Sequence, residues 1–334
     1  MNLEIERLEM NISHQDPSSQ SPARINSIDP DREHNQRLFY SMGRLIYSLN
    51  RNNGYSQPVM ETKENIMSFH HIEAFKFLIQ DASTIRVNST GQNTTFELDF
   101  LACNPQLLAN ANCMLNATQS LGPTAVDYSK QGAEVYLTVD SSVYKTNLGS
   151  LPPQEKFALN DDISEITFDK EFTKLYVITH SSETETHTVR YFNLLTDELS
   201  KPILLNGNPD QITHAVFVGD QAIICQTRAD RNPLLLLDPY SGKYSYVSEE
   251  ITTLPCNHSE CSGVLAITAL AYHSNKDQSL FAVDGGSTLI SLSYNGNQNN
   301  RQESNCNVMM LFDIILYLGL CYYRSDACQD KIVF

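Results

Sequence analysis

After about Thr94 the chain consists of short runs in which apolar residues alternate with polar ones. Gly, Asn, Asp and Ser separate these runs. Alternation over a few residues is typical of strands with one buried face, and the separating residues favour tight turns. The pattern predicts an antiparallel, mainly β region.

Four parts of this region share the order strand, polar turn, apolar strand, polar turn, strand. They begin at Ala125, Ile166, Ala215 and Leu270. One aromatic residue in each part is taken as equivalent: Tyr128, Phe168, Phe217 and Tyr272. The steps between these residues are 40, 49 and 55 positions, close to the repeat of about 40 to 50 residues that propeller blades show.

The four parts resemble blades of a β-propeller. Their turns, DPYSGK from Asp238 and NLLTDE from Asn193, are similar to strand-and-turn units of several propeller families. The WD type is excluded because the chain has no Trp. The resemblance implies a propeller-like domain over residues 91–300 with about five blades, either complete or part of a larger ring; a β-sandwich is the alternative.

The segment GAEVYLTVDSSVYKTNLGSL, from Gly132, also resembles the opening blade of sema domains, the propellers of semaphorins and plexins. The resemblance covers some twenty residues. The resemblance implies an extracellular receptor or ligand propeller, in a complete or truncated form.

A helical segment is predicted over residues 31–90. Apolar residues recur there at spacings of three and four: Leu38, Met42, Leu45, Ile46 and Leu49. This is the helical period, so a helix is expected from about Asp31 to Leu49, with Asp31 as its cap. The stretch from Ile66 to Ile79 fits a helix or a strand, and its length favours a helix.

Residues 1–30 are predicted to be a disordered lead-in, because Ser, Pro, Gln and Asp dominate them from His14 onward. They contain no pattern of a secretory signal peptide. As written, the chain is therefore expected in the cytoplasm; an incomplete N-terminus would instead favour an extracellular protein.

The C-terminal tail, residues 301–334, contains the apolar run Val308 to Tyr323, which includes Asp313. A bilayer-spanning helix needs about 20 apolar residues, and a carboxylate inside it is costly. Three interpretations follow: a buried element that closes the domain, a membrane anchor, or a sequence end foreign to the fold.

The net charge of −16 argues against nucleic acids and anionic membrane surfaces, since both bind through Lys and Arg. A protein partner is expected instead. The 16 Tyr and the abundant Asn suit protein contacts, although Tyr is also a common strand residue.

Two cysteine pairs could close loops in an oxidising compartment: Cys103 with Cys113, and Cys256 with Cys261. Cys225 lies in an apolar run and is expected to be a buried free thiol. Acceptor motifs for N-glycosylation occur at Asn11, Asn88, Asn93, Asn116 and Asn257. Their number is what the abundance of Asn, Ser and Thr predicts by chance.

No motif of a catalytic site is found. The chain has no G-x-S-x-G and no phosphate-binding glycine loop. Cys256, His258 and Cys261 could contribute to a zinc site but lack a fourth ligand at matching spacing. His70 and His71 should point apart, and only the fold could bring the remaining strand histidines together: His180, His187 and His214.

The leading hypothesis is a noncatalytic, protein-binding propeller with no cofactor or metal. The first alternative is the sema-like receptor or ligand, disulfide-bonded and glycosylated. The second is a propeller enzyme acting on glycans or small molecules, which requires carboxylates or histidines to converge on one pocket.

Overall fold

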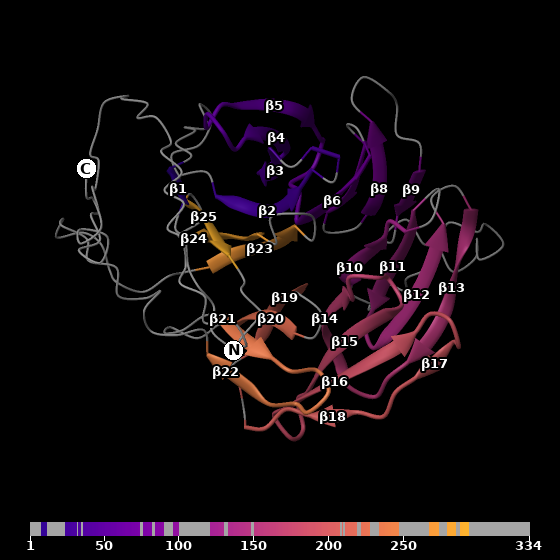
Figure 1. Ribbon diagram of the computed structural model, residues 1–334. Helices are drawn as coiled ribbons and strands as arrows, with labels where there is room; N and C mark the ends of the chain where they lie inside the picture. The colour runs from indigo at the N-terminus through magenta and orange to yellow at the C-terminus, as the bar shows by residue number, and fades with distance from the viewer. Residues whose placement is uncertain are drawn as a thin grey trace, which may run out of the picture.

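The computed structural model describes residues 8–11, 24–99, 121–246 and 267–293, apart from short gaps within these ranges. The described residues form six antiparallel sheets set radially around a central axis (Figure 1). In five sheets the strands follow sequence order from the axis outward, and one of these sheets has a fifth strand; the sixth sheet ends on β1. This is the arrangement of a β-propeller, and we number its blades 1 to 6.

The strands of blades 1 to 3 have these bounds. Blade 1 consists of β2 (Ile25–Pro30), β3 (Arg37–Met42), β4 (Leu45–Asn50) and β5 (Ser56–Glu61). Blade 2 consists of β6 (Ser68–Glu73), β7 (Lys76–Gln80), β8 (Thr84–Ser89) and β9 (Phe96–Asp99). Blade 3 consists of β10 (Leu121–Asp127), β11 (Glu134–Val139), β12 (Ser142–Asn147) and β13 (Ser150–Ala158).

Blades 4 to 6 complete the ring. Blade 4 consists of β14 (Asp162–Phe168), β15 (Lys174–Ser181), β16 (Thr186–Asn193), β17 (Glu198–Leu199) and β18 (Ile203–Leu204). Blade 5 consists of β19 (Ile212–Val218), β20 (Ala222–Thr227), β21 (Leu234–Leu237) and β22 (Tyr244–Tyr246). Blade 6 consists of β23 (Ile267–His273), β24 (Ser279–Asp284), β25 (Thr288–Ser293) and β1 (Leu8–Asn11).

Blade 6 is built from both ends of the described chain. Its three inner strands come from residues 267–293, and its outermost strand is β1. β1 pairs antiparallel with β25, so that Leu8 lies opposite Ser291 and Asn11 opposite Thr288. The ring is therefore closed by hydrogen bonds between segments that are far apart in sequence.

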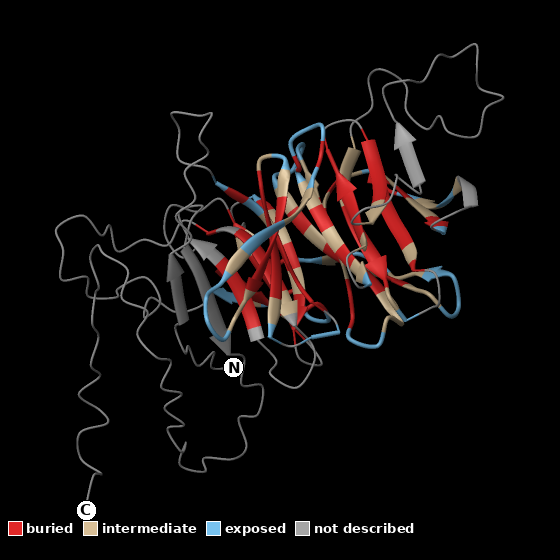
Figure 2. Cartoon of the chain, turned by 90° about the horizontal axis from the view of Figure 1, so that it is seen from above, coloured by how far each residue is buried: buried red, intermediate tan, exposed pale blue. Residues whose placement is uncertain are grey.

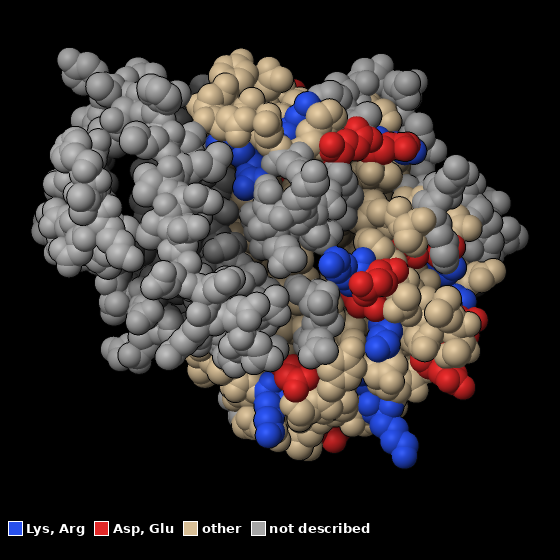
Figure 3. Space-filling model, viewed as in Figure 1, with Lys and Arg blue, Asp and Glu red and all other residues tan. Residues whose placement is uncertain are grey.

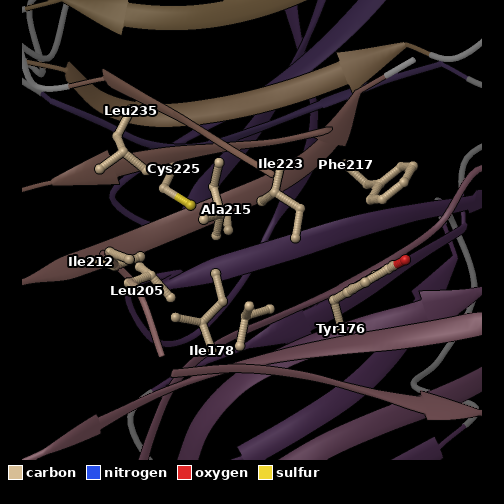
Figure 4. Packing of buried hydrophobic residues seen from close by; sticks show 11 residues of the cluster. Tyr176, Ile178, Leu205, Ile212, Ala215, Phe217, Ile223, Cys225 and Leu235 are labelled. Atoms are coloured by element: carbon tan, nitrogen blue, oxygen red, sulfur yellow. The ribbon is translucent and has the colours of Figure 1, made fainter. Parts of the chain in front are cut away.

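The hydrophobic core is divided into six clusters, and each cluster joins two neighbouring blades. Figure 4 shows the cluster between blades 4 and 5, where Tyr176 and Ile178 of β15 face Phe217 of β19 and Ile223 of β20. The cluster between blades 6 and 1 packs Phe281 against Tyr40 and Leu38. Because these contacts run around the whole ring, closure buries apolar surface at every interface.

Buried residues follow the strands, and exposed residues gather in the turns at both ends of the blades (Figure 2). Aspartates fix several of these turns. Asp169 accepts hydrogen bonds from the backbone N–H groups of Thr173 and Lys174 at 2.7 and 3.0 Å, and from the Thr173 hydroxyl at 2.6 Å. Asp81 and Asp238 accept comparable bonds in their own turns. Such side-chain bonds satisfy backbone donors that no strand pairs.

The mainly β fold of propeller type is confirmed, and the four repeated units correspond to blades 3 to 6. Residues 25–99 add blades 1 and 2, so the sheets number six where the spacing predicted about five. The described part of the segment expected to be helical, 31–90, forms strands. Two stretches of the expected disordered lead-in also form strands, Leu8–Asn11 and Ile25–Pro30.

Strands β3 and β4 explain the helix-like spacing. They form a hairpin whose turn contains Gly43, with φ of 56°. Both strands are buried on both faces, because blade 1 is packed between blades 6 and 2. A strand with two buried faces loses the alternation that identifies it, so the apolar residues of two adjacent strands mimic the period of a helix.

Candidate functional site

A cavity of about 470 Å³ lies on the axis of the ring. Its wall is formed mainly by the innermost strands of all six blades, β2, β6, β10, β14, β19 and β23. The aromatic residues expected to be equivalent all line it: Tyr128, Phe168, Phe217 and Tyr272. The repeat found in the sequence therefore corresponds to one position on the cavity wall.

One acid–base pair stands in this wall. Nδ1 of His214, on β19, lies 3.0 Å from Oε2 of Glu165 on β14. Nε2 of the same ring lies 3.0 Å from the carbonyl oxygen of Leu270 on β23. Glu165 is buried, whereas the His214 side chain is 42% exposed toward the cavity. The pair connects blades 4, 5 and 6.

The hydrogen-bond geometry favours the protonated form of the His214 ring. A carbonyl oxygen can only accept a hydrogen bond, so Nε2 donates, and an ionised carboxylate likewise takes a donor from Nδ1. Burial by itself lowers the pKa of His214, but the charge of Glu165 and the hydrogen bonds to Glu165 and Leu270 outweigh it and raise the pKa. In the protonated form both nitrogens donate, and the ring then has no lone pair to accept a proton.

A second polar network joins blades 2 and 3. Nε2 of His70 lies 3.1 Å from the carbonyl oxygen of Thr124 on β10. The amide of Gln80 donates to the Gly122 carbonyl at 3.1 Å, and its oxygen accepts from the hydroxyls of Ser68 at 3.0 Å and Thr124 at 3.3 Å. These polar groups are therefore held by the neighbouring blade.

The same arrangement recurs between blades 5 and 6. The register differs between the two blades: His214 lies opposite Gln226 in blade 5, whereas in blade 2 His70 lies opposite Leu78 and Gln80 lies opposite Ser68. The Gln226 amide donates to the carbonyl of Ile267, on the innermost strand of blade 6. In two opposite blades, a His and a Gln thus bond the backbone of the next blade.

Two polar atoms near the cavity have no hydrogen-bond partner within the described residues. They are Oγ1 of Thr213 and Oε1 of Gln226. Both residues line the cavity, so a bound water or a small polar molecule could satisfy them there.

The histidines predicted to diverge do so. His70 bonds β10, whereas the ring of His71 is buried with its centroid 4.7 Å from that of Phe39 and 5.5 Å from that of Phe77. His214 is in the cavity wall. His180 and His187 come together elsewhere, on β15 and β16, with ring centroids 4.7 Å apart.

The buried free thiol of Cys225 is confirmed, and burial raises its pKa. Asn88 lies on β8, and its Oδ1 is buried without a partner among the described residues. Asn11 lies in β1. The other predicted sites lie outside the described residues: Cys103, Cys113, Cys256, Cys261, Asn93, Asn116, Asn257 and His258.

The pair of Glu165 and His214 was not predicted from the sequence, although the repeat contains a signal for it. Glu165 lies three positions before Phe168, and His214 lies three positions before Phe217. Equivalent positions on adjacent innermost strands are neighbours in a propeller, so alignment of the repeats would have placed an acid beside a base.

No protein-family model matches the chain, and no curated protein is similar to it. Within the described residues, no helix has the length and hydropathy needed to cross a bilayer. The apolar run Val308 to Tyr323 lies outside those residues.

Proposed function

We propose that the chain is a noncatalytic propeller that binds a protein partner through the outer rim of blades 4 and 5. The observation that carries this proposal is a set of three exposed apolar residues on neighbouring outer elements of blades 4 and 5, Leu204, Tyr240 and Tyr246, which we call the rim. Their exposed fractions are 56%, 48% and 40%. Exposed apolar residues that gather on one part of a surface are typical of protein interfaces, and Tyr is enriched there.

The rim has a rigid base. Leu204 lies on β18, and the turn that carries Tyr240 is joined to this region by a hydrogen bond from Asn206 N–H to the Gly242 carbonyl at 2.9 Å. The Tyr176 hydroxyl donates to that of Tyr240 at 3.0 Å. A surface that is already ordered loses little conformational entropy when it binds.

The charge around the rim indicates the chemistry of the partner. Nζ of Lys174 lies 5.0 Å from the ring centroid of Tyr191 and 5.3 Å from that of Tyr240. Lys201 and Lys243 are exposed beside β18 and Gly242. On the face shown in Figure 3, charges of both signs are otherwise interspersed. We therefore expect a protein segment that combines aliphatic or aromatic side chains with carboxylates.

The cavity wall brings together two histidines and three carboxylates, as the enzyme alternative requires: His70, His214, Asp29, Glu165 and Asp169. The proposal of a noncatalytic cavity rests on how several of its polar groups are bonded. Its acid–base pair has both imidazole nitrogens bonded, and His70 and Gln80 are bonded to the backbone of blade 3. A general base needs a free lone pair within reach of a substrate. These groups serve to align the blades.

The experiment compares the full chain with Leu204→Asp in affinity capture from cell extract, followed by binding measurements with the purified partner. Tyr55→Asp is the matched control, because Tyr55 is 62% exposed on blade 1. We expect Leu204→Asp to weaken binding at least tenfold, about 1.4 kcal/mol, and Tyr55→Asp to leave it unchanged. Equal binding by both variants, or substrate turnover that depends on His214, would overturn the proposal.

A further inference from the structure

A pair of histidines lies in blade 4, away from the residues that form the cavity wall. His180 on β15 and His187 on β16 are directly opposite each other in the antiparallel ladder. Their ring centroids are 4.7 Å apart, with 40° between the ring planes. Side chains at opposite positions in a ladder share one face of the sheet, so both imidazoles project to the same side.

His187 is unusual for a buried polar residue. It is 2% exposed, and neither Nδ1 nor Nε2 has a hydrogen-bond partner within the part of the chain that the structure describes. Burial of an unpaired polar group costs free energy, and most native proteins supply a partner. The position therefore requires a partner that is not a described protein atom.

The chemical state of His187 suits a metal ligand. Burial, and then the neighbouring His180, lower the pKa of His187 to about 4. The ring is consequently neutral at pH 7 and carries a lone pair on one nitrogen. A metal ion binds imidazole through such a lone pair, with no proton to displace.

We propose that His180 and His187 together bind a divalent transition-metal ion of the class that prefers imidazole: Zn²⁺, Ni²⁺ or Cu²⁺. The site lies beside the rim, because the His187 carbonyl accepts a hydrogen bond from the N–H of Leu205, the residue after Leu204. The ion gives a buried nitrogen of His187 its missing partner, and His180, which is only partly buried, leaves a path for entry.

The turn between the two strands carries negative charge. Residues 182–185 connect β15 to β16, and Glu183 and Glu185 are exposed within this turn. Two carboxylates in the turn that connects the strands add negative charge to this end of the hairpin. Water would fill the remaining coordination positions, since two protein ligands leave a divalent ion incompletely coordinated.

A group of three possible metal ligands lies elsewhere in the described residues and supplies a control. Ligand atoms of Asp31, Glu33 and His34 lie within 4.8 Å of one another. Glu33 and His34 are exposed, and Arg37 Nε lies 3.4 Å from Asp31 Oδ2. An exposed acidic cluster carries no proposal by itself, but it could bind added metal.

The test is a calorimetric titration of the full chain with Ni²⁺ after treatment with a chelator. We expect the wild-type chain to bind one ion at this site and His180→Ala to weaken binding at least tenfold. His34→Ala should leave the affinity unchanged. His187→Leu should also abolish the site; if that buried substitution prevents folding, the more exposed His180→Ala still decides the question.

A second measurement separates ligation from a change in stability. With Cu²⁺ bound, electron paramagnetic resonance should show coupling to two imidazole nitrogens in the wild type and to one in His180→Ala. Three results would overturn the proposal: no binding of Ni²⁺, loss of binding in His34→Ala with retention in His180→Ala, or a sulfur-to-metal charge-transfer band that places the ion on cysteine.

Discussion

His214 connects three blades through a single side chain. The ring belongs to blade 5, its Nδ1 meets Glu165 of blade 4, and its Nε2 donates to the Leu270 carbonyl of blade 6. The raised pKa of His214 shows that these contacts favour the imidazolium over the neutral ring. The charge on one residue therefore contributes to the alignment of half the ring.

At the residue scale, we predict that the free energy of unfolding falls as the pH rises through the pKa of His214. The folded pKa lies above the unfolded value of about 6.5, so the stabilisation is complete below pH 6.5 and is lost above the folded pKa. Glu165→Gln should lower the pKa of His214 and flatten this dependence. Proton NMR titration of the His214 ring and urea unfolding at several pH values would measure both effects.

The control for this prediction is Glu171→Gln, which removes the same charge at an exposed turn position of blade 4. It should leave the titration of His214 unchanged. If Glu165→Gln also left it unchanged, the ion pair would not be the cause of the raised pKa.

Sequence alone could have suggested this pair but not its chemistry. The equal offsets of Glu165 and His214 from Phe168 and Phe217 indicate neighbouring positions once the repeat is known. The third contact is to the carbonyl oxygen of Leu270, on β23, whose register shifts between Ile267 and Ala269. Backbone carbonyls carry no sequence signal, so the full set of bonds to His214 could not be predicted.

At the scale of the elements, the turns determine how blades fit together. Gly242 has φ of 67° and lies against the backbone of Leu204, so a Cβ atom there would collide with the Leu204 carbonyl. Gly43 has a similar φ of 56°, but its added Cβ would have Asn65 Oδ1 as nearest neighbour, at 3.8 Å. The two glycines share a backbone conformation and differ in available space.

We predict that Gly242→Ala destabilises the protein more than Gly43→Ala does. Alanine in the left-handed backbone region lowers the free energy of unfolding by about 1 to 2 kcal/mol, and this loss is common to both variants. The collision between blades 5 and 4 adds about 1 to 3 kcal/mol for Gly242→Ala alone. Urea unfolding monitored by circular dichroism measures the difference. Equal losses of unfolding free energy in the two variants would mean that the turn can move away from β18 without destabilising the protein.

Strands inside the repeat were predicted correctly even where both faces are buried, as in β20 and β21, because short runs between turns mark them. Outside the repeat, only alternation could identify a strand. Within the repeat, strand β16 shows such alternation, with buried Val189 between partly exposed Thr188 and Arg190. In β3, consecutive residues Leu38, Phe39 and Tyr40 are all buried. Local periodicity cannot distinguish such a strand from a helix, because the neighbours that bury its second face come from blades distant in sequence.

At the scale of the whole molecule, the repeat predicted the type of architecture but not its closure. Blades 3 to 6 have similar sequences of strands and turns, and their spacing was recognisable. β1 has only four residues, Leu8–Asn11, and no pattern within them indicates a partner near residue 290. A pairing over such a separation is determined by the completed ring.

We predict that deletion of residues 1–11 destabilises the ring, because it removes β1 and leaves β25 as an unpaired edge. Loss of a few net hydrogen bonds should cost about 3 kcal/mol. The midpoint of urea unfolding would show the change. Deletion of residues 1–7, which precede β1, is the control and should leave the midpoint unchanged; equal effects of both deletions would contradict a role of β1 in closure.

The pairing of β1 with β25 also constrains how the protein is made. During translation at about 5 to 20 residues per second, residues 8–11 leave the ribosome roughly 15 to 60 s before their partner strand has been synthesised. Throughout that interval β1 is a strand without a partner, and on a polysome the nearest β25 to be completed belongs to the chain ahead of it. Slow translation of residues 267–293 would therefore favour exchange of β1 between neighbouring chains, and dimers linked in this way would form during synthesis rather than after it.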